Sequence, residues 1–344
     1  MTERGVTMTF MSTTGQPPVP LAGAPGPFGA LRMTPGRWVV LAIGVPAALA
    51  LIGWTGFSLV ATTARGSYPF SLPVPVQGGQ VAVNVTAGNI TLRPGSGGAA
   101  QLTGTVQYGL IRPSIMENTT PTGTNLGVNC DGIGSGNCGV NASLDVPART
   151  AVTLWSNGGD IQASGFSSGM TLWAEGGNVT ASNLTGDLRL DTGGGDLTST
   201  GLTGTLTIGT EGGNVNAGDW VGSGTMYINT GGGDLTADGV TGDFQVAAMG
   251  GNVYATGVAS GVADVDSGGG NVTLTFTKVP QNLRIAAEGG AVTVVLPPGG
   301  TKYDISTPDT AGGNVYYPSS LFSSKSQHTI TIDSGGGDIT VSQG

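Results

Sequence analysis

The feature that most constrains the fold of this chain is a four-residue motif, Gly-Gly-(Asp/Asn)-(Ile/Leu/Val), which recurs along its C-terminal part. Successive motifs are 18, 18, 18, 20, 18, 19, 20, 23 and 24 residues apart. A period near twenty is typical of solenoids, in which each unit packs only against its neighbours. The third position of the motif, called the polar position below, is filled by Asp160, Asn178, Asp196, Asn214, Asp234, Asn252, Asn271, Asn314 and Asp338. In one unit, Ala291 takes this place.

Apolar residues keep fixed offsets from this polar position: one residue after it, and six and eight residues before it. Because side chains of a strand alternate between its two faces, such columns predict inward-facing positions on two strands per repeat. The intervening positions are polar and mostly threonine. The column eight residues before the polar position contains Val152, Met170, Leu188, Leu206, Met226, Phe244, Ala263, Leu283 and Ile330.

The pattern therefore predicts an all-β fold, a single-chain β-solenoid with two strands per 18–20-residue coil. Roughly ten coils stacked at about 4.8 Å would form a rod about 50 Å long. At the glycine turn we expect positive φ angles, which only glycine adopts cheaply. The following residues, Asp160, Asn178, Asp196, Asn214, Asp234, Asn252 and Asn271, are predicted to form a structural hydrogen-bonded ladder.

The N-terminal segment predicts a membrane anchor. An uncharged apolar run from Trp38 through Ala61 is long enough to cross a bilayer as a helix. Three arginines precede the run and Arg65 alone follows it closely, which places the N-terminus in the cytoplasm by the positive-inside rule. The alternative is a cleaved signal peptide, but the run is about twice the usual h-region length and no clean Ala-x-Ala site follows it.

Four regions follow from these patterns. Residues 1–36 are predicted to be a disordered cytoplasmic tail, 37–62 a transmembrane signal anchor, 66–150 an irregular β cap, and 151–344 the solenoid repeats. The far end, at Ile339 to Val341, has no following cap, so we expect partner chains or residues 297–327 to cover it.

Charge excludes one class of partner. The whole chain has a formal charge of −9, and from residue 66 onward eight Lys or Arg oppose twenty Asp or Glu, which gives −12. Such a surface repels phosphate backbones, so no nucleic-acid partner is expected.

Two cysteines, Cys130 and Cys138, flank a glycine-rich loop. In an extracytoplasmic segment this spacing favours a disulfide that closes a hairpin. The alternative, a redox or metal pair, lacks C-x-x-C spacing and further ligands.

Candidate chemistry is sparse. His328 is the only histidine, so a Ser-His-Asp triad or a histidine metal cluster would depend on it alone. A uronate-cleaving groove needs Lys or Arg, and the regular coils offer only Arg189, Lys278 and Arg284. The repeat also lacks the nonapeptide of calcium-binding β-rolls. We therefore expect no catalytic residue, no cofactor and no dedicated metal site.

Trp155 and Trp173 are the sharpest candidates for a binding site. Both lie five residues before the polar position, in an outward column, and should stack on adjacent coils. Exposed indoles are typical of sugar or protein contacts. The alternative, which we favour at this level, is that the 66–150 cap covers them. Trp220 falls in an inward column and is expected in the core.

These units resemble the bacterial putative-adhesin β-strand-repeat family, a family of unknown function. The resemblance covers residues 75–344 and rests on the serial motifs, on Gly88-Asn89-Ile90-Thr91, and on Val146-Pro147-Ala148 before the first full repeat. The resemblance implies a solenoid similar to a right-handed β-helix, without a recognised catalytic set, and a role in adhesion.

The sequence thus predicts a bacterial, single-pass membrane protein with an extracytoplasmic solenoid that acts as an adhesin or surface scaffold, with a cell-surface glycan or protein as partner. The first alternative is an envelope-stress or sensory protein whose tail contacts a cytoplasmic protein. The second, less favoured, is a carbohydrate-active β-helix enzyme.

Overall fold

The computed structural model describes residues 43–55, 58, 65–76, 78–86, 88–120, 123–129 and 138–344. The chain divides into two units, Met1–Phe57 and Ser58–Gly344, and the described part of the first is a helix over 43–55. Among the described residues, no helix has the length and apolar character needed to cross a membrane. The predicted tail at 1–36 and much of the predicted anchor at 37–62 lie outside the described residues, so both stay predictions.

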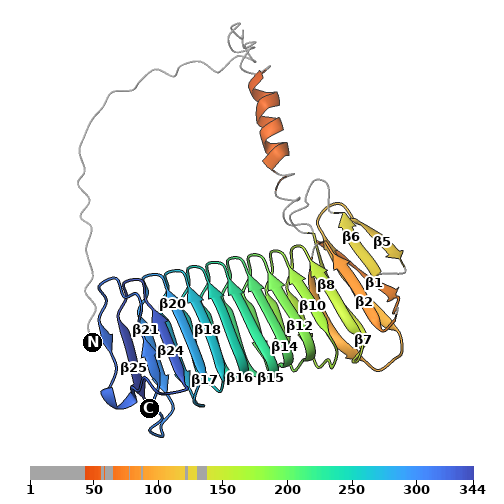
Figure 1. Ribbon diagram of the computed structural model, residues 1–344. Coiled ribbons are helices and arrows are strands. Elements are labelled where there is room, and N and C mark those ends of the chain that lie inside the picture. The colour runs from red at the N-terminus through yellow and green to blue at the C-terminus, as the bar shows by residue number, and fades with distance from the viewer. Residues whose placement is uncertain are drawn as a thin grey trace, which may run out of the picture. The chain divides into compact units, whose positions relative to one another are not determined.

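The second unit is the predicted all-β solenoid, in which parallel strands stack into a long rod with a sheet on each side (Figure 1). We name the two sheets by their outer surfaces. The tryptophan face is formed by β2 (Gln80–Val85), β8 (Ala151–Ser156), β10 (Met170–Ala174), β12 (Thr185–Thr192), β14 (Thr203–Thr210), the C-terminal parts of β15 (Val215–Thr230) and β16 (Leu235–Ala248), β18 (Val262–Ser267), β20 (Asn282–Ala287), β24 (Thr329–Asp333) and β22 (Asp304–Ser306).

The threonine face is the opposite sheet. It is formed by β3 (Asn89–Gly95), β9 (Ile161–Ser164), β11 (Val179–Ser182), β13 (Leu197–Thr200), the N-terminal parts of β15 and β16, β17 (Val253–Val258), β19 (Val272–Phe276), β21 (Val292–Leu296), β25 (Ile339–Gln343) and β23 (Val315–Tyr316).

The strand register confirms the predicted inward columns. Val152 pairs with Met170, Met170 with Leu188 and so on to Ile330, each one coil from the next. All of these side chains are buried. The core is therefore a continuous apolar stack between the two sheets, in which each coil covers the open side of the previous one.

The geometry of the glycine turn changes the explanation for its glycines, which were predicted to adopt positive φ angles. The glycine directly before each ladder residue does not adopt a positive φ. Instead, a Cβ at Gly195 or Gly213 would overlap the backbone carbonyl of the equivalent glycine one coil back. At the other turn, one position with positive φ is filled by Gly165, Asn183, Gly201, Asp219, Gly239 and Gly257. At the glycine turn of the repeats, the predicted positive φ occurs in the last coils, at Gly269, Gly289, Gly312 and Gly336. Close stacking of backbones therefore requires the glycine directly before each ladder residue, and positive φ favours the preceding glycine in the last coils.

The ladder at the glycine turn forms as expected. The Oδ1 atom of Asp160 accepts a hydrogen bond from the backbone N–H of Asn178 at 2.8 Å, and Oδ1 of Asn178 accepts from the N–H of Asp196 at 2.8 Å. The same bond recurs to the N–H of Ala291 at 2.9 Å. Amide side chains add a second bond, as from Asn214 Nδ2 to Asp196 Oδ1 at 3.3 Å. Each side chain therefore satisfies an amide of the next coil.

Inward-facing hydroxyls, which the sequence analysis missed, complete the turn. Thr192 donates to the carbonyl of Gly177 at 2.8 Å, Thr210 to that of Gly213 at 2.8 Å, and Ser267 to that of Gly270 at 3.0 Å. These bonds satisfy carbonyl groups close to the apolar core, where an unpaired oxygen is costly.

Residues 66–150 extend the rod at its N-terminal end. β2 and β3 pair with β8 and β9 as one further coil. β1 (Gly66–Val74), β4 (Ala100–Tyr108) and β7 (Gly139–Pro147) form an antiparallel layer joined to β3, while a hairpin of β5 (Ser114–Thr120) and β6 (Gly123–Asn129) joins β2.

At the other end, the last coils do not stack in chain order. β24 lies between β20 and β22, and β25 lies between β21 and β23. The coil that contains Asp338 is therefore inserted beneath the one that contains Asn314, whose N–H bonds to Asp338 Oδ1 at 2.8 Å. The segment 297–327, which includes a 3-10 turn η2 (Ser319–Leu321), thus covers the end of the rod.

Candidate functional site

The two indoles predicted as a site lie on the outside of the tryptophan face. Trp155 on β8 pairs with Trp173 on β10, and the same column continues through Asp191, Gly209 and Asn229. The two rings stack with their centroids 6.0 Å apart and an interplanar angle of 27°. The period of 18 residues places them directly beside each other, as the sequence predicted.

The cap does not cover this pair, which corrects the favoured prediction. Trp155 is 47% exposed and Trp173 is half-buried. β2 is the next parallel strand of the same sheet beside β8, and Asn84 is the register partner of Trp155. The cap therefore extends the face and leaves the indoles open to solvent. Trp220, by contrast, is 1% exposed and lies in the core as predicted.

A buried carboxylate follows the indoles. Asp191 is 5% exposed, and Arg189 Nε lies 2.8 Å from its Oδ2. Arg189 Nη2 also donates a hydrogen bond to Asp191 Oδ1 at 3.3 Å, so one guanidinium contacts both oxygens of the carboxylate. Burial raises the pKa of the Asp191 carboxyl, and the charge of Arg189 opposes the shift. A Cβ at Gly209 would overlap Asp191 Oδ1, so the glycine of the next coil makes room for this carboxylate.

Three hollows follow one another along the tryptophan face. The first, of about 330 Å³, is lined by Asn84, Asn125 and Trp155 among others. The second, of about 440 Å³, is lined by Trp173, Arg189, Asp191, Gly209, Glu211, Asn229 and Met249 among others. The third, of about 530 Å³, is lined by Met249, Asp266, Arg284 and Glu288 among others. A linear ligand along the rod would cross all three.

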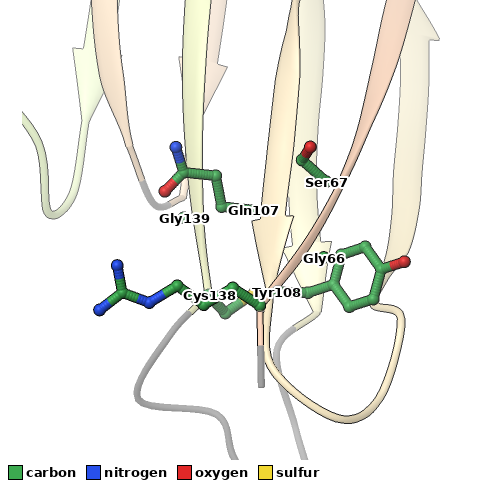
Figure 2. Close-up of a pocket in the computed structure, with 7 residues that line it drawn as sticks. Gly66, Ser67, Gln107, Tyr108, Cys138 and Gly139 are labelled. Atoms are coloured by element: carbon green, nitrogen blue, oxygen red, sulfur yellow. The ribbon is translucent and has the colours of Figure 1, made fainter. Parts of the chain in front are cut away.

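Another hollow, of about 530 Å³, lies at the N-terminal end, between β1, β4 and the start of β7 (Figure 2). It is lined by Arg65, Gly66, Ser67, Gln107, Tyr108, Cys138 and Gly139. No carboxylate or imidazole is among these residues, so they offer no acid–base pair. Nearby, the guanidinium of Arg112 lies 3.9 Å from the centroid of the Tyr68 ring, a contact that fixes the β4–β5 connection.

The remaining predicted residues have structural contacts. The ladder carboxylates accept backbone N–H bonds, and His328 Nδ1 lies 3.0 Å from the carbonyl of Pro280. Cys138 is disulfide-bonded, whereas Cys130 lies outside the described residues, so the predicted pairing stays a prediction. Within the described ranges, no group of three or more His, Cys, Asp or Glu is placed to hold a metal ion.

Together, the stacked coils and the open face define an extended β-solenoid with one chemically varied surface. The chain belongs to the Toastrack DUF4097 family, whose model matches residues 67–342. This confirms the predicted family, an adhesin-like one of unknown function.

Solved structures match the chain at low similarity. A putative cell adhesion protein from Clostridium sporogenes is 12% identical, with 81% of this chain and 100% of that chain covered and a TM-score of 0.22. A putative lipid binding protein from Parabacteroides distasonis is 9% identical, with 82% and 97% covered and a TM-score of 0.35. A putative adhesin from Bacteroides fragilis is 13% identical, with 81% and 97% covered and a TM-score of 0.30. No curated protein matches the chain.

Proposed function

We propose that this chain is a membrane-anchored, extracytoplasmic adhesin or surface scaffold, which binds a glycan through its tryptophan face and has no catalytic activity. The observation that carries the proposal is the exposed stack of Trp155 and Trp173 beside three successive hollows. Large aromatic side chains that remain open to solvent, with polar groups around them, are typical of binding surfaces.

The non-catalytic role rests on what the candidate groups already contact. His328 is engaged with a backbone carbonyl, and the repeated Asp and Asn side chains are engaged along the ladder. Arg284 contacts both Asp264 and Asp266, at 2.9 and 2.7 Å, and these bonds raise the pKa of its guanidinium. A general acid or base needs a free group in reach of a substrate, and these side chains are committed to the fold.

The membrane anchor rests on the uncharged run within 37–62 and the arginine bias before it. The expected result is that the full chain stays in the membrane fraction after alkaline carbonate extraction, and that protease added to intact cells removes the solenoid. Release of the chain by carbonate would contradict the anchor.

Binding is tested with a glycan and cell-wall-polymer screen on the full chain in detergent micelles. The double variant Trp155→Ala, Trp173→Ala should lose at least about tenfold in affinity, since an anchoring aromatic contributes 1–2 kcal/mol or more. The matched control is Tyr254→Ala, an exposed aromatic on the threonine face. Equal binding by the double variant, or no binding by the folded chain, would refute the glycan site.

A further inference from the structure

The aromatic stack on the tryptophan face ends abruptly. Trp155 packs against one side of the Trp173 ring, and the next positions of the column are Asp191 and Gly209. No aromatic side chain continues the stack in that direction. The second side of the Trp173 ring therefore lies toward the hollow of about 440 Å³ that Trp173 lines.

The hollow contains a carboxylate that a single guanidinium contacts. Asp191 lines the hollow and is 5% exposed, with Arg189 Nε 2.8 Å from its Oδ2 and Arg189 Nη2 donating to its Oδ1 at 3.3 Å. An ionised carboxylate has about four acceptor sites, so a ligand in the hollow can donate a further hydrogen bond to Asp191. Gly209 keeps the space next to this carboxylate clear, because a Cβ would overlap it.

The charge of the site selects against anions. Arg189, Asp191 and Glu211 line the hollow and sum to a formal charge of −1. The guanidinium of Arg189 is already paired with Asp191, and that of Arg284, further along the face, with Asp264 and Asp266. An anionic sugar would thus find Arg189 and Arg284 already paired, whereas a cation would face Glu211 and the carboxylate of Asp191, which it would share with Arg189.

We propose that the hollow beside Trp173 is a subsite for a cationic amino sugar, a pyranose that carries a free ammonium group. The inference rests on the proposed glycan-binding function and names the class of sugar. The C–H face of the ring packs on the indole, and the ammonium group donates hydrogen bonds to Asp191 and Glu211. A linear amino-sugar polymer extends into the neighbouring hollows around Met249 and Trp155.

A sugar fits better than a lysine-rich peptide. A pyranose is rigid and loses little conformational freedom, whereas each lysine side chain gives up about 2 kcal/mol of rotamer entropy when it is fixed. Trp173 also offers a flat apolar surface that a ring covers and a single ammonium group does not.

The experiment compares a glucosamine hexamer with an N-acetylglucosamine hexamer on the full chain in detergent micelles, by isothermal titration calorimetry near pH 6. The two probes differ only in whether the amine is free or acetylated. We expect the free amine to bind at least about tenfold more tightly, and its affinity to fall with added salt. A lysine hexamer serves as a probe for general cation binding.

Asp191→Asn keeps the shape of the side chain and removes its charge. We expect it to weaken binding of the glucosamine hexamer by about tenfold or more, while Tyr254→Ala on the threonine face leaves binding unchanged. Far-UV circular dichroism shows whether each variant is folded.

The outcomes separate this inference from the proposed function. Equal or tighter binding of the acetylated hexamer would overturn the amino-sugar subsite and leave the glycan-binding proposal standing. Equal binding of the lysine hexamer, or unchanged binding by Asp191→Asn, would likewise overturn it. Failure of every sugar and wall polymer to bind would refute both.

Discussion

The two outer faces of the solenoid share one interior but differ in what they show to solvent. On the threonine face the outward column is mostly threonine, at Thr180, Thr198, Thr236 and Thr273, with Asn216 and Tyr254 between them. On the tryptophan face the equivalent columns hold indoles, an ion pair, glycine and amides. The inward columns are equally apolar on both sides.

This difference teaches which residues folding requires. A solenoid needs its inward columns and its glycine turns, and a β-branched polar residue is sufficient outside. The threonine face meets that minimum. The tryptophan face, with a buried carboxylate and exposed indoles, contains side chains that this minimum does not require. Under the proposed function, a binding surface accounts for these residues.

The largest expected effect separates an indole of the core from an indole of the face. Trp220→Ala should destabilise the solenoid by about 3–5 kcal/mol, because the ring is buried and its Nε1 donates to the carbonyl of Gly204 at 3.1 Å. Trp155→Ala should cost less than about 1 kcal/mol. Urea denaturation followed by circular dichroism measures both, and equal losses would break the distinction between interior and face.

The next effect tests the turn that joins the two faces. Gly213→Ala places a Cβ against the carbonyl of Gly195 and should cost about 3 kcal/mol or prevent folding. Gly212→Ala is the matched control, because a Cβ there meets nothing within 4 Å. We expect it to change stability by less than about 0.5 kcal/mol. A similar loss for both would mean that the backbone conformation of the turn, and not contact with the neighbouring coil, explains the glycines.

The sequence was sufficient to predict most of the fold, since a nearly constant period forces side chains of equal offset into one column. Leu188 and Leu206 could be paired without coordinates for that reason. The reversed order of the last coils could not be predicted, because the spacings of Asn314 and Asp338 give the length of a coil and not its place in the stack.

The site was predictable to a lesser extent. Register alone placed Trp155 beside Trp173, but their exposure depends on where β2 lies, which no periodicity gives. The burial of Asp191 was missed because the outward column predicts exposure, and the space for its carboxylate depends on the missing side chain of Gly209, one coil away. The alternation of Glu175 with Gly193 in the sequence was a signal of close contact between coils: a Cβ at Gly193 would overlap the carbonyl of Glu175.

A smaller effect concerns the one gap in the ladder. The backbone N–H of Ala291 donates to Asn271 Oδ1, but Ala291 has no side-chain acceptor for the N–H of Asp338, whose coil lies next to it. Ala291→Asn supplies that acceptor and should raise stability by about 1 kcal/mol. Thermal melting by circular dichroism measures the change. An unchanged or lower melting temperature would show that the ladder is a consequence of stacking and does not stabilise it.

The smallest expected effect is on the pH dependence of stability, and it compares Asp338 of the ladder with Asp191 of the tryptophan face. Hydrogen bonds from Asn314 lower the pKa of Asp338, so its contribution is present above the unfolded-state pKa and is lost as the pH falls through the folded-state value. Burial raises the pKa of Asp191, so the folded state holds its proton more tightly, and stability falls as the pH rises through the window above the unfolded-state pKa.

The two variants should therefore change acid stability in opposite directions. The stability of the wild-type protein rises with pH as Asp338 ionises, and Asp338→Asn removes that rise. Its stability falls with pH through the window above the unfolded-state pKa of Asp191, and Asp191→Asn removes that fall. Melting temperatures measured from pH 2.5 to 7 give both slopes. At neutral pH we expect Asp191→Asn to be at least as stable as wild type, although it binds the amino sugar less tightly. If Asp191→Asn loses both stability and binding, the role of Asp191 is structural, like that of the residues on the threonine face. The difference between the two faces would then depend on the indoles alone.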